Sequence, residues 1–581
     1  MGKDINNIKS LFLKLLPAQV FVVITSMLSG LISGLITGSH LNSDSMVALG
    51  LVLPLTSIVG AVAMIVSGGV GVLSGRFMGM GQVKKLNNVF STAVLFASII
   101  GIAFAVTAFV FSNQLAILFG ANEATLLYTS TYIRGLAIGL IPMLIVPTFM
   151  TFLQMCNKSS ISLVATILLA CFNICFALLS INVFNLGIFG IGISTSLSQV
   201  LSMLAIIIYF VAKKDIATFS LKMFEKNILL DIIKLGSPAC LANFLYSIRN
   251  IFINKYALSV GGLGAVNALS IMNSCAFLDS VNIGLASTVT MLASVFAGER
   301  DSKSIKGLAK VAIITGEIID AVRIVLVFFL SERISILFGA QGEVIKLSKD
   351  LLFIYNLASP FNILVCTLIS SNQSLGKVAY CNFVYLFNCI ITPLLCCVTL
   401  TKVIGIYGVF VCYALAEIVS LIIMIIATSI INKAPVKSFY DLIHFDSNFE
   451  IKDKMSISIN DAKGVVEVSE KIQAFCKTKG IDSKRSMLAG LCMEEMAGNV
   501  VEHGFDKDNI ENTIDIFVHI IDNEISMRLR DNCVPFDPKS KLEMYDSNDP
   551  TKNIGIKLVT KIAKSMNYQT TFGLNVLTIK L

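Results

Sequence analysis

Charged residues are scarce in this 581-residue sequence: Asp, Glu, Lys and Arg make up only 14% of it, against about 25% in soluble globular domains. Hydrophobic residues make up 55%. This composition excludes a soluble enzyme for most of the chain. The scarcity is confined to residues 1–445, which hold 27 Lys and Arg and 16 Asp and Glu, whereas residues 446–581 hold 18 and 21. The sequence therefore consists of two parts of different composition. The excess of Lys and Arg in the first part indicates basic residues at the ends of membrane spans rather than nucleic-acid binding.

Three kinds of motif are also missing. The fourteen cysteines show no metal-ligand spacing, and many, such as Cys171 and Cys396, lie in apolar runs, so we interpret them as small core residues in a reducing setting. The first apolar run has no small-residue cleavage site and continues to spanning length, which argues against a cleaved signal peptide. No Gly-x-x-x-x-Gly-Lys-Ser/Thr pattern occurs, so we do not expect ATP to drive transport directly.

Apolar stretches of about 20 residues, the length that a helix needs to cross about 30 Å of hydrocarbon, fill the first part of the sequence. Twelve can be placed, near 15–38, 46–67, 89–112, 134–153, 161–183, 188–211, 235–257, 267–295, 308–330, 351–371, 378–400 and 404–431. Lys and Arg gather in alternate loops, as at Lys84, Lys158, Lys234 and Lys377. We therefore expect a polytopic all-α bundle over 1–435 in the cell membrane, with both termini in the cytoplasm.

An internal repeat runs through this part. ILFGA at 117–121 recurs at 336–340, NKSS at 157–160 resembles NQSL at 372–375, and MVALG at 46–50 resembles VNALS at 266–270. The offset between the two copies is nearly the same for all three pairs. We therefore expect two six-helix halves, about 10–215 and 230–432, paired around a central cavity as in many transporters.

Residues 10–432 resemble the multidrug and toxic compound extrusion (MATE) family. The resemblance rests on the twofold repeat, the Phe-Gly-Ala turn before the fourth and tenth spans, and the Gly-rich second span that runs into Gly75-Arg76-Phe77-Met78-Gly79. It implies a secondary antiporter that exports small organic molecules against a coupling cation, Na⁺ or H⁺. The sequence departs from the family in two places: 15–38 holds no Asp or Glu, and Tyr246 and Arg249 follow Pro238 where one branch has an acid.

Charged residues away from the ends of the predicted spans all fall in the second half: Arg249, Asp279, Glu317, Asp320, Arg323 and Glu417. Burying an unpaired charge in a membrane is costly, so such residues are kept for pairing or for function. In one interpretation, Asp320 or Glu317 neutralises Arg323 on the same helix, and Arg249 pairs with Asp279 across two helices. In the other, Asp279 or Glu417 is a coupling site for a cation or proton.

Residues 446–581 have a different periodicity. Segments 455–459, 514–520, 524–530 and 576–581 alternate or cluster apolar residues like strands, and 463–479, 484–503 and 554–566 have helical spacing. We therefore expect one cytoplasmic α+β domain.

Three short motifs in this domain carry possible chemistry. In MEEMAGNVVEHGF (493–505), Glu495, Asn499 and His503 are four residues apart and so share one helix face, where a carboxylate can orient a water or hydroxyl and an amide oxygen can bind Mg²⁺. Asp531 follows a strand and can accept the amine of adenine. Asn553 and Gly555 open a helix whose backbone N–H groups can approach a phosphate.

In this order the three motifs resemble the N, G1 and G2 boxes of the GHKL ATP-binding fold, and most closely the anti-sigma-factor serine kinases, whose final strand resembles Gly573–Thr578. The resemblance implies that ATP and Mg²⁺ bind here, with Glu495 as general base, Asn499 as Mg²⁺ ligand and Asp531 as adenine reader. His503, Asn553 and Gly555 would contribute to the ATP site. Cys533 and Asn553 stand where the family usually has Gly, which favours nucleotide binding over fast turnover.

Several functions remain open from the sequence. The first is a MATE-like transporter of small molecules with a regulatory ATP-binding domain and a possible protein partner of that domain. The second is a membrane-anchored serine kinase or ATP-dependent sensor whose bundle no longer transports. A lipid-linked flippase is a third, and it would need a strongly basic central cavity, which Arg249 and Arg323 alone do not establish.

Overall fold

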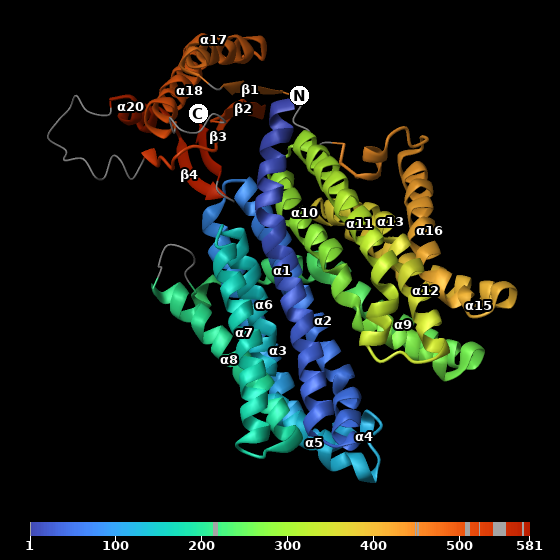
Figure 1. Cartoon of the computed structure of the whole chain (residues 1–581). Coiled ribbons are helices and arrows are strands. Elements are labelled where there is room, and N and C mark those ends of the chain that lie inside the picture. Colours follow the sequence, from blue (N-terminus) through green and yellow to red (C-terminus); the bar gives the residue numbers. More distant parts are fainter. Residues whose placement is uncertain are drawn as a thin grey trace. The chain divides into compact units, whose positions relative to one another are not determined.

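The structure is a computed structural model of the chain, and it describes residues 2–212, 219–447, 449, 453–459, 461–505, 512–521, 523–538, 554–571 and 574–581. The chain divides into two compact units, most of residues 1–445 and residues 446–581. Figure 1 labels their elements, and the two units are described separately.

The first half of the helical unit contains eight helices. They are α1 (Gly2–His40), α2 (Ser43–Gly79), α3 (Val83–Val110), α4 (Ser112–Leu118), α5 (Glu123–Ala137), α6 (Leu140–Met155), α7 (Ser159–Asn182) and α8 (Gly187–Ala212). Helices α5 and α6 lie on either side of a 46° bend and together have the length and composition of one membrane span.

The second half repeats this pattern with more interruptions. It comprises η1 (Leu221–Met223), α9 (Lys226–Ser274), η2 (Ala276–Asp279), α10 (Ser280–Gly298), α11 (Ser302–Leu337), α12 (Glu343–Leu357), α13 (Ser359–Ser374), α14 (Val378–Leu386), the π-helical turn η3 (Phe387–Ile391), α15 (Thr392–Ile404), α16 (Tyr407–Asn432) and η4 (Phe439–Leu442). Helix α9 is broken at Gly262, whose φ is 63°. Helices α12 and α13 meet at a 43° bend.

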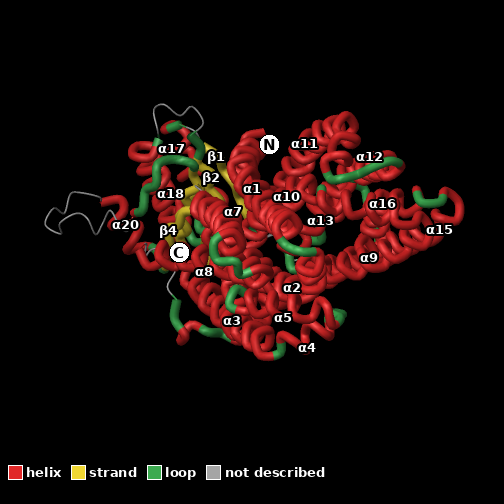
Figure 2. Tube along the Cα trace, turned by 60° about the horizontal axis from the view of Figure 1, so that its bottom comes forward, coloured by secondary structure: helices red, strands yellow, loops and turns green. Residues whose placement is uncertain are grey.

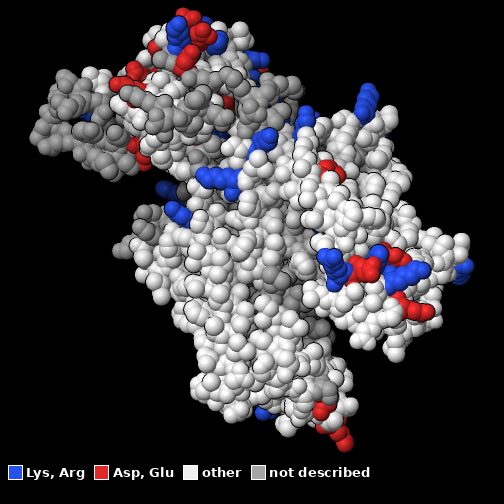
Figure 3. Space-filling view, in the orientation of Figure 1, with Lys and Arg blue, Asp and Glu red and all other residues white. Residues whose placement is uncertain are grey.

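The described helices account for the predicted spans. By length and composition nine of them can cross a membrane, and eleven spans result if each bent pair counts as one. Helix α11 occupies the place of the remaining predicted span, 308–330, but its charged side chains set it apart from the others. Figure 3 shows a broad surface of this unit over α1 and α7 that is almost free of charged side chains. The chain is thus a multi-pass membrane protein. All fourteen of its cysteines are free thiols.

Backbone conformations define the residue-by-residue alignment of the two halves better than the sequence does. Positive φ angles occur at Gly81 and Arg300, at Gly120 and Gly339, and at Asn157 and Gly376, and the offset in residue number is identical for the three pairs. Each of the last two pairs ends a helix with the same backbone bond: Ala121 and Ala340 donate to the carbonyl five residues before them, and so do Lys158 and Lys377. Asn157 is therefore equivalent to Gly376, so the predicted pairing of 157–160 with 372–375 was displaced by four residues.

The two halves meet where equivalent glycines face each other. A Cβ on Gly79 of α2 would lie 2.0 Å from the Val295 carbonyl oxygen, and one on Gly298 of α10 would lie 2.2 Å from the Arg76 carbonyl oxygen. Only glycine permits backbones to approach this closely. In Figure 1 the halves lie together near α10 and diverge toward α5 in one half and α15 in the other.

The second unit is one antiparallel sheet with helices. Strands β1 (Lys454–Ile459), β2 (Ile514–Ile521), β3 (Glu524–Asp531), β4 (Ser565–Thr571) and β5 (Leu574–Lys580) are ordered β1-β2-β3-β5-β4. Helices α17 (Ala462–Thr478), α18 (Ser483–Gly504) and α20 (Ile554–Ile562) contribute to its buried core together with the strands. Figure 2 shows that the strands are confined to this unit. The expected α+β fold is confirmed.

Candidate functional sites

Three interrupted helices bring polar side chains together inside the second half of the membrane unit. Asp279 ends the 3₁₀ turn η2 and precedes α10, Ser359 begins α13 after the 43° bend, and Asn388 lies in the π-helical turn η3. Interruptions of this kind leave backbone groups that must be satisfied inside the protein, and they recur at the binding sites of transporters.

Arg323 of α11 is the centre of an ion-pair cluster. Its guanidinium lies 2.8 Å from Asp320 and 3.7 Å from Asp279, and it donates to the Leu278 carbonyl and to Ser359, which in turn donates to Asp320. The side chain of Asp320 is fully buried. Asp320, rather than Glu317, therefore neutralises Arg323, and Glu317 lies half-buried one turn earlier without an ion pair to a described residue.

The expected pair of Arg249 with Asp279 does not form. Asp279 accepts a hydrogen bond from Tyr355 at 2.7 Å and faces Arg323. The guanidinium of Arg249 lies instead 4.4 Å from the ring centre of Tyr246 and 4.9 Å from that of Tyr413. Cation–π contacts of this kind stabilise a buried guanidinium without a carboxylate.

Glu417 of α16 is held in a different way. One carboxylate oxygen accepts from Asn362 and the other from Asn388, both at 3.0 Å. Asn282 connects the two parts of the network, because it donates to Asn362 and to Ser359. In the described part of the chain, Glu417 makes no ion pair, so its carboxylate is bound only by neutral amides.

In the second unit, α18 carries the first predicted motif. The side-chain nitrogen of Asn499 donates to the backbone carbonyl of Glu495 at 2.7 Å, which leaves its amide oxygen for another partner. The ring of His503 is exposed and stacks on Phe536, with the ring centres 5.9 Å apart. The three residues lie along one helix, as the spacing predicts.

Asp531, at the end of β3, is 4% exposed and held by two donors. Its Oδ1 accepts from the Asn575 side chain at 2.7 Å and from the Cys533 backbone nitrogen at 3.0 Å. Burial raises the pKa of Asp531 above its ordinary value, against the hydrogen bonds from Asn575 and Cys533. Burial, and then the charge of Asp531, raise the pKa of Cys533 to about 12, so this thiol stays protonated. Cys533 packs in the core, beside Gly504.

Gly555 joins the first and third motifs. A Cβ on Gly555 would lie 1.9 Å from Oε2 of Glu495, so the carboxylate rests against the start of α20. The predicted site residue Asn553 lies outside the described residues. Glu495, Asn499 and Gly555 thus share one region of the second unit.

Family models match both units. The MatE family model matches residues 18–179 and 238–398, which together cover more than half of the chain. The chain belongs to the MatE family. A second model, the histidine kinase-like ATPase domain, matches residues 460–581. This MatE protein therefore carries a C-terminal domain of the histidine kinase-like ATPase type, as the motif order suggested.

Curated relatives and solved structures agree with this assignment. Multidrug export protein MepA of Staphylococcus saprophyticus is 25% identical over 59% of this chain and 77% of its own length. Probable multidrug resistance protein YoeA of Bacillus subtilis is 26% identical over 60% and 76%. The structure of a mutant of the Vibrio cholerae MATE transporter VcmN matches 72% of this chain and 95% of its own, with a TM-score of 0.68 and 15% identity, which shows the shared fold.

Sequence reasoning did not identify the neutral residues of either site. Asn282, Asn362 and Asn388 lie in apolar stretches, and a polar amide in a predicted span was the available signal. Asn575 was noted only as part of a final strand, although a buried Asn in a strand requires hydrogen-bond partners.

Proposed function

We propose that this MatE protein exports small organic molecules by cation-coupled antiport across the cell membrane, with both termini in the cytoplasm. The relatives that are named for multidrug export support the substrate class. The observation that carries the coupling is Glu417, a partly buried carboxylate bound by two amides without a described cationic partner.

Charge counting favours Glu417 over Asp279 for this role. The acids of this network are Asp279, Asp320 and Glu417, against the two positive charges of Arg249 and Arg323. Glu317, a fourth acid on α11, forms no ion pair with a described residue and is not counted. Arg323 contacts both aspartates, so the excess negative charge belongs to the carboxylate that no guanidinium contacts. A proton or Na⁺ would neutralise it, and carboxylate and amide oxygens are suitable ligands for either.

The test is efflux of a fluorescent cationic dye from proteoliposomes that hold a proton or Na⁺ gradient. Glu417→Gln keeps the size of the side chain and one acceptor, so the protein should fold, bind dye and lose gradient-driven efflux. Glu343→Gln, at an exposed position in the first turn of α12, is the matched control and should transport normally. Efflux by Glu417→Gln at the unchanged rate would exclude this coupling site.

We propose further that the C-terminal domain binds ATP with Mg²⁺ and regulates the membrane unit. Asn499 would hold Mg²⁺ through its amide oxygen, Glu495 would orient a water or hydroxyl, and Asp531 would accept the adenine amine. Mg²⁺ held there would supply positive charge to neutralise the phosphate oxygens of ATP. The contact between Glu495 and Gly555 supports this assignment, because it places an acidic group beside a helix start that can approach phosphate.

The test of this second proposal is ATP binding by the full chain in detergent. Asp531→Ala removes the acceptor of the adenine amine at a cost of about 1–3 kcal/mol, so ATP affinity should fall roughly tenfold or more. Asp515→Ala changes another buried aspartate of the same sheet, one that bonds Ser458 and Arg530, and should leave affinity unchanged if the domain folds. Equal affinity in Asp531→Ala and the wild type would remove Asp531 from the site.

A protein serine kinase or ATP-dependent sensor is the second candidate. Arg323 compensates Asp279, and the predicted spans 15–38 and 235–257 contain no acid, which favours a bundle that does not transport. In that case the full chain would transfer phosphate from ATP to a protein serine, while dye efflux would be absent in the wild type as well.

A further inference from the structure

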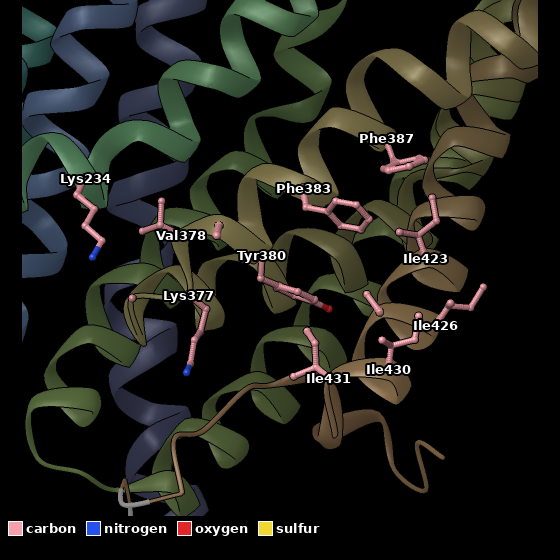
Figure 4. A pocket seen from close by; sticks show the side chains of 13 residues that line it. Lys234, Lys377, Val378, Tyr380, Phe383, Phe387, Ile423, Ile426, Ile430 and Ile431 are labelled. Carbon is pink, nitrogen blue, oxygen red and sulfur yellow. The ribbon is translucent and has the colours of Figure 1, made fainter. Parts of the chain in front are cut away.

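A cavity of about 820 Å³ opens between α9, α14 and α16 of the membrane unit (Figure 4). Its walls are almost entirely apolar and include Phe383, Phe387 and Ile426. Two lysines line it as well, Lys234 from α9 and Lys377 from the residue before α14. In Figure 4 both lysine side chains lie at one side of the cavity, away from Phe387 and Ile423.

The position of the cavity along the helices corresponds to one leaflet of a bilayer. Lys234 and Lys377 directly precede the predicted spans 235–257 and 378–400, so both ammonium groups belong at the same membrane surface. From Lys377 to Phe387 the chain advances ten residues, which is about 15 Å of helix. That length is about half of the 30 Å hydrocarbon core. The cavity therefore extends from the membrane surface to about the middle of the bilayer.

The apolar walls are open to the surroundings of the unit rather than enclosed. Phe383 is 44% exposed, Ile426 53% and Ile430 71%. In a membrane protein, such side chains face acyl chains. A groove that is apolar along its length and cationic at its surface end matches a lipid with an anionic headgroup, because basic pockets between helices at the membrane surface hold such headgroups.

Two further contacts shape the cavity wall. The Tyr380 hydroxyl lies 3.4 Å from the Thr428 hydroxyl, and its ring packs against His444 with centres 4.4 Å apart. His444 is itself held by its backbone nitrogen, which donates to the Asn372 side chain at 2.9 Å. Both contacts fix Tyr380, so part of the cavity wall is already formed without a ligand.

The internal repeat shows that the aromatic side chains of this groove have no aromatic counterparts in the first half. At the offset that relates Asn157 to Gly376, Lys377 is equivalent to Lys158, but Tyr380 is equivalent to Ile161 and Phe383 to Val164. The aromatic wall is therefore an addition to the repeated scaffold.

From these observations we propose that the cavity binds an anionic phospholipid of the leaflet on the lysine side. One acyl chain lies along α14 and α16, and the phosphate lies between Lys234 and Lys377. The proposal is independent of whether the bundle transports, because it requires only the membrane unit.

The sequence contains no tryptophan, so one introduced tryptophan can report on this cavity alone. Phe383→Trp in the full chain is reconstituted into phosphatidylcholine nanodiscs that contain a minor fraction of brominated phosphatidylglycerol, whose bromines quench indole fluorescence. Quenching by brominated phosphatidylglycerol should be at least twice the quenching by the same fraction of brominated phosphatidylcholine. Val164→Trp occupies the equivalent exposed position of the first half and should show no such difference.

The lysines are tested in the same background. Lys234→Gln with Lys377→Gln should lower the affinity for phosphatidylglycerol roughly tenfold, and the corresponding double change to Arg should preserve it. Lys158→Gln with Lys226→Gln removes two exposed lysines away from the cavity and is the matched control. If Phe383→Trp does not fold, Ile426→Trp reports on the same wall.

Three outcomes would overturn the proposal. Equal quenching by both brominated lipids would mean an ordinary contact with bulk lipid. A preference that persists without the two lysines would place the headgroup elsewhere. Loss of the preference on addition of millimolar inorganic phosphate would mean that the lysines bind free phosphate rather than a lipid.

Discussion

The ion-pair cluster of α11 allows a quantitative test by double-mutant cycles. Arg323 lies 2.8 Å from Asp320, and the two side chains are 8% and 0% exposed. Removing one member of such a buried pair leaves an uncompensated charge, which costs about 3–5 kcal/mol. Arg323→Gln leaves two carboxylates, Asp320 and Asp279, without their cation, so its free energy of unfolding should fall by the upper part of that range.

The cycles should rank the partners by geometry. Arg323→Gln combined with Asp320→Asn should show a coupling energy of about 1–3 kcal/mol, because the two residues are in direct contact. Arg323→Gln combined with Asp279→Asn should give a smaller coupling, since the separation is 3.7 Å and Asp279 is 25% exposed. Asp279→Asn combined with Arg249→Gln should give the smallest coupling of the three, because no ion pair joins the two side chains.

The assay is denaturant-induced unfolding of the purified chain in detergent, followed by circular dichroism. The exposed pair of Lys349 with Glu332, 2.9 Å apart, supplies the control cycle and should give no more than about 1 kcal/mol. A coupling energy between Asp279 and Arg249 larger than that between Asp279 and Arg323 would refute the arrangement described above.

The remaining predictions concern the C-terminal domain and topology. Glu495→Gln should keep ATP binding and abolish hydrolysis or phosphotransfer, whereas Asn499→Ala should weaken Mg²⁺-dependent binding. Titration calorimetry measures the binding, and a phosphate-release assay measures the hydrolysis. Asn575→Ala should lower ATP affinity through a misplaced Asp531, with thermal melting as the check on folding. Burial raises the pKa of Asp531, and its ionised form is the stronger acceptor for the adenine amine. As the pH decreases, ATP affinity should therefore begin to fall at a pH above the ordinary pKa of a carboxyl, and Asp531→Asn should flatten this dependence. A reporter fused after Leu581 should be active only in the cytoplasm.

The sequence predicted the membrane fold well because span length and hydropathy are properties of single helices. It placed the boundaries less well where a helix is interrupted. The predicted span 267–295 contains the 3₁₀ turn η2. Its first residues belong to helix α9, which is broken at Gly262. Mean hydropathy averages over a window of residues and so does not detect a local change of backbone conformation.

In the C-terminal domain, the order of motifs predicted which segments meet, but not how Asp531, the proposed adenine reader, is held. Asp531 and Asn575 are 44 residues apart in sequence and become neighbours only because β5 pairs with β3. Strand order depends on tertiary packing, and it cannot be inferred from the residue pattern of a single sequence. The expected pair of Arg249 and Asp279 was wrong for a similar reason: complementary charges on two helices form a pair only if the helices present them to each other.

Comparison of the two repeats distinguishes the backbone features that both halves of the membrane unit share from the polar residues that only one half contains. The bends of 46° between α5 and α6 and 43° between α12 and α13 occur at equivalent places, so the interruption belongs to the fold that both halves share. At the offset that relates the two halves, the partners of Ser359 and Asn362 are Leu140 and Met143, which cannot form the same hydrogen bonds. Because the first half keeps the bend without the polar groups, the bend itself does not require a bound ion. The ionisable cluster is therefore specific to the second half, and the proposed coupling cation would act on one half of a structurally symmetric bundle.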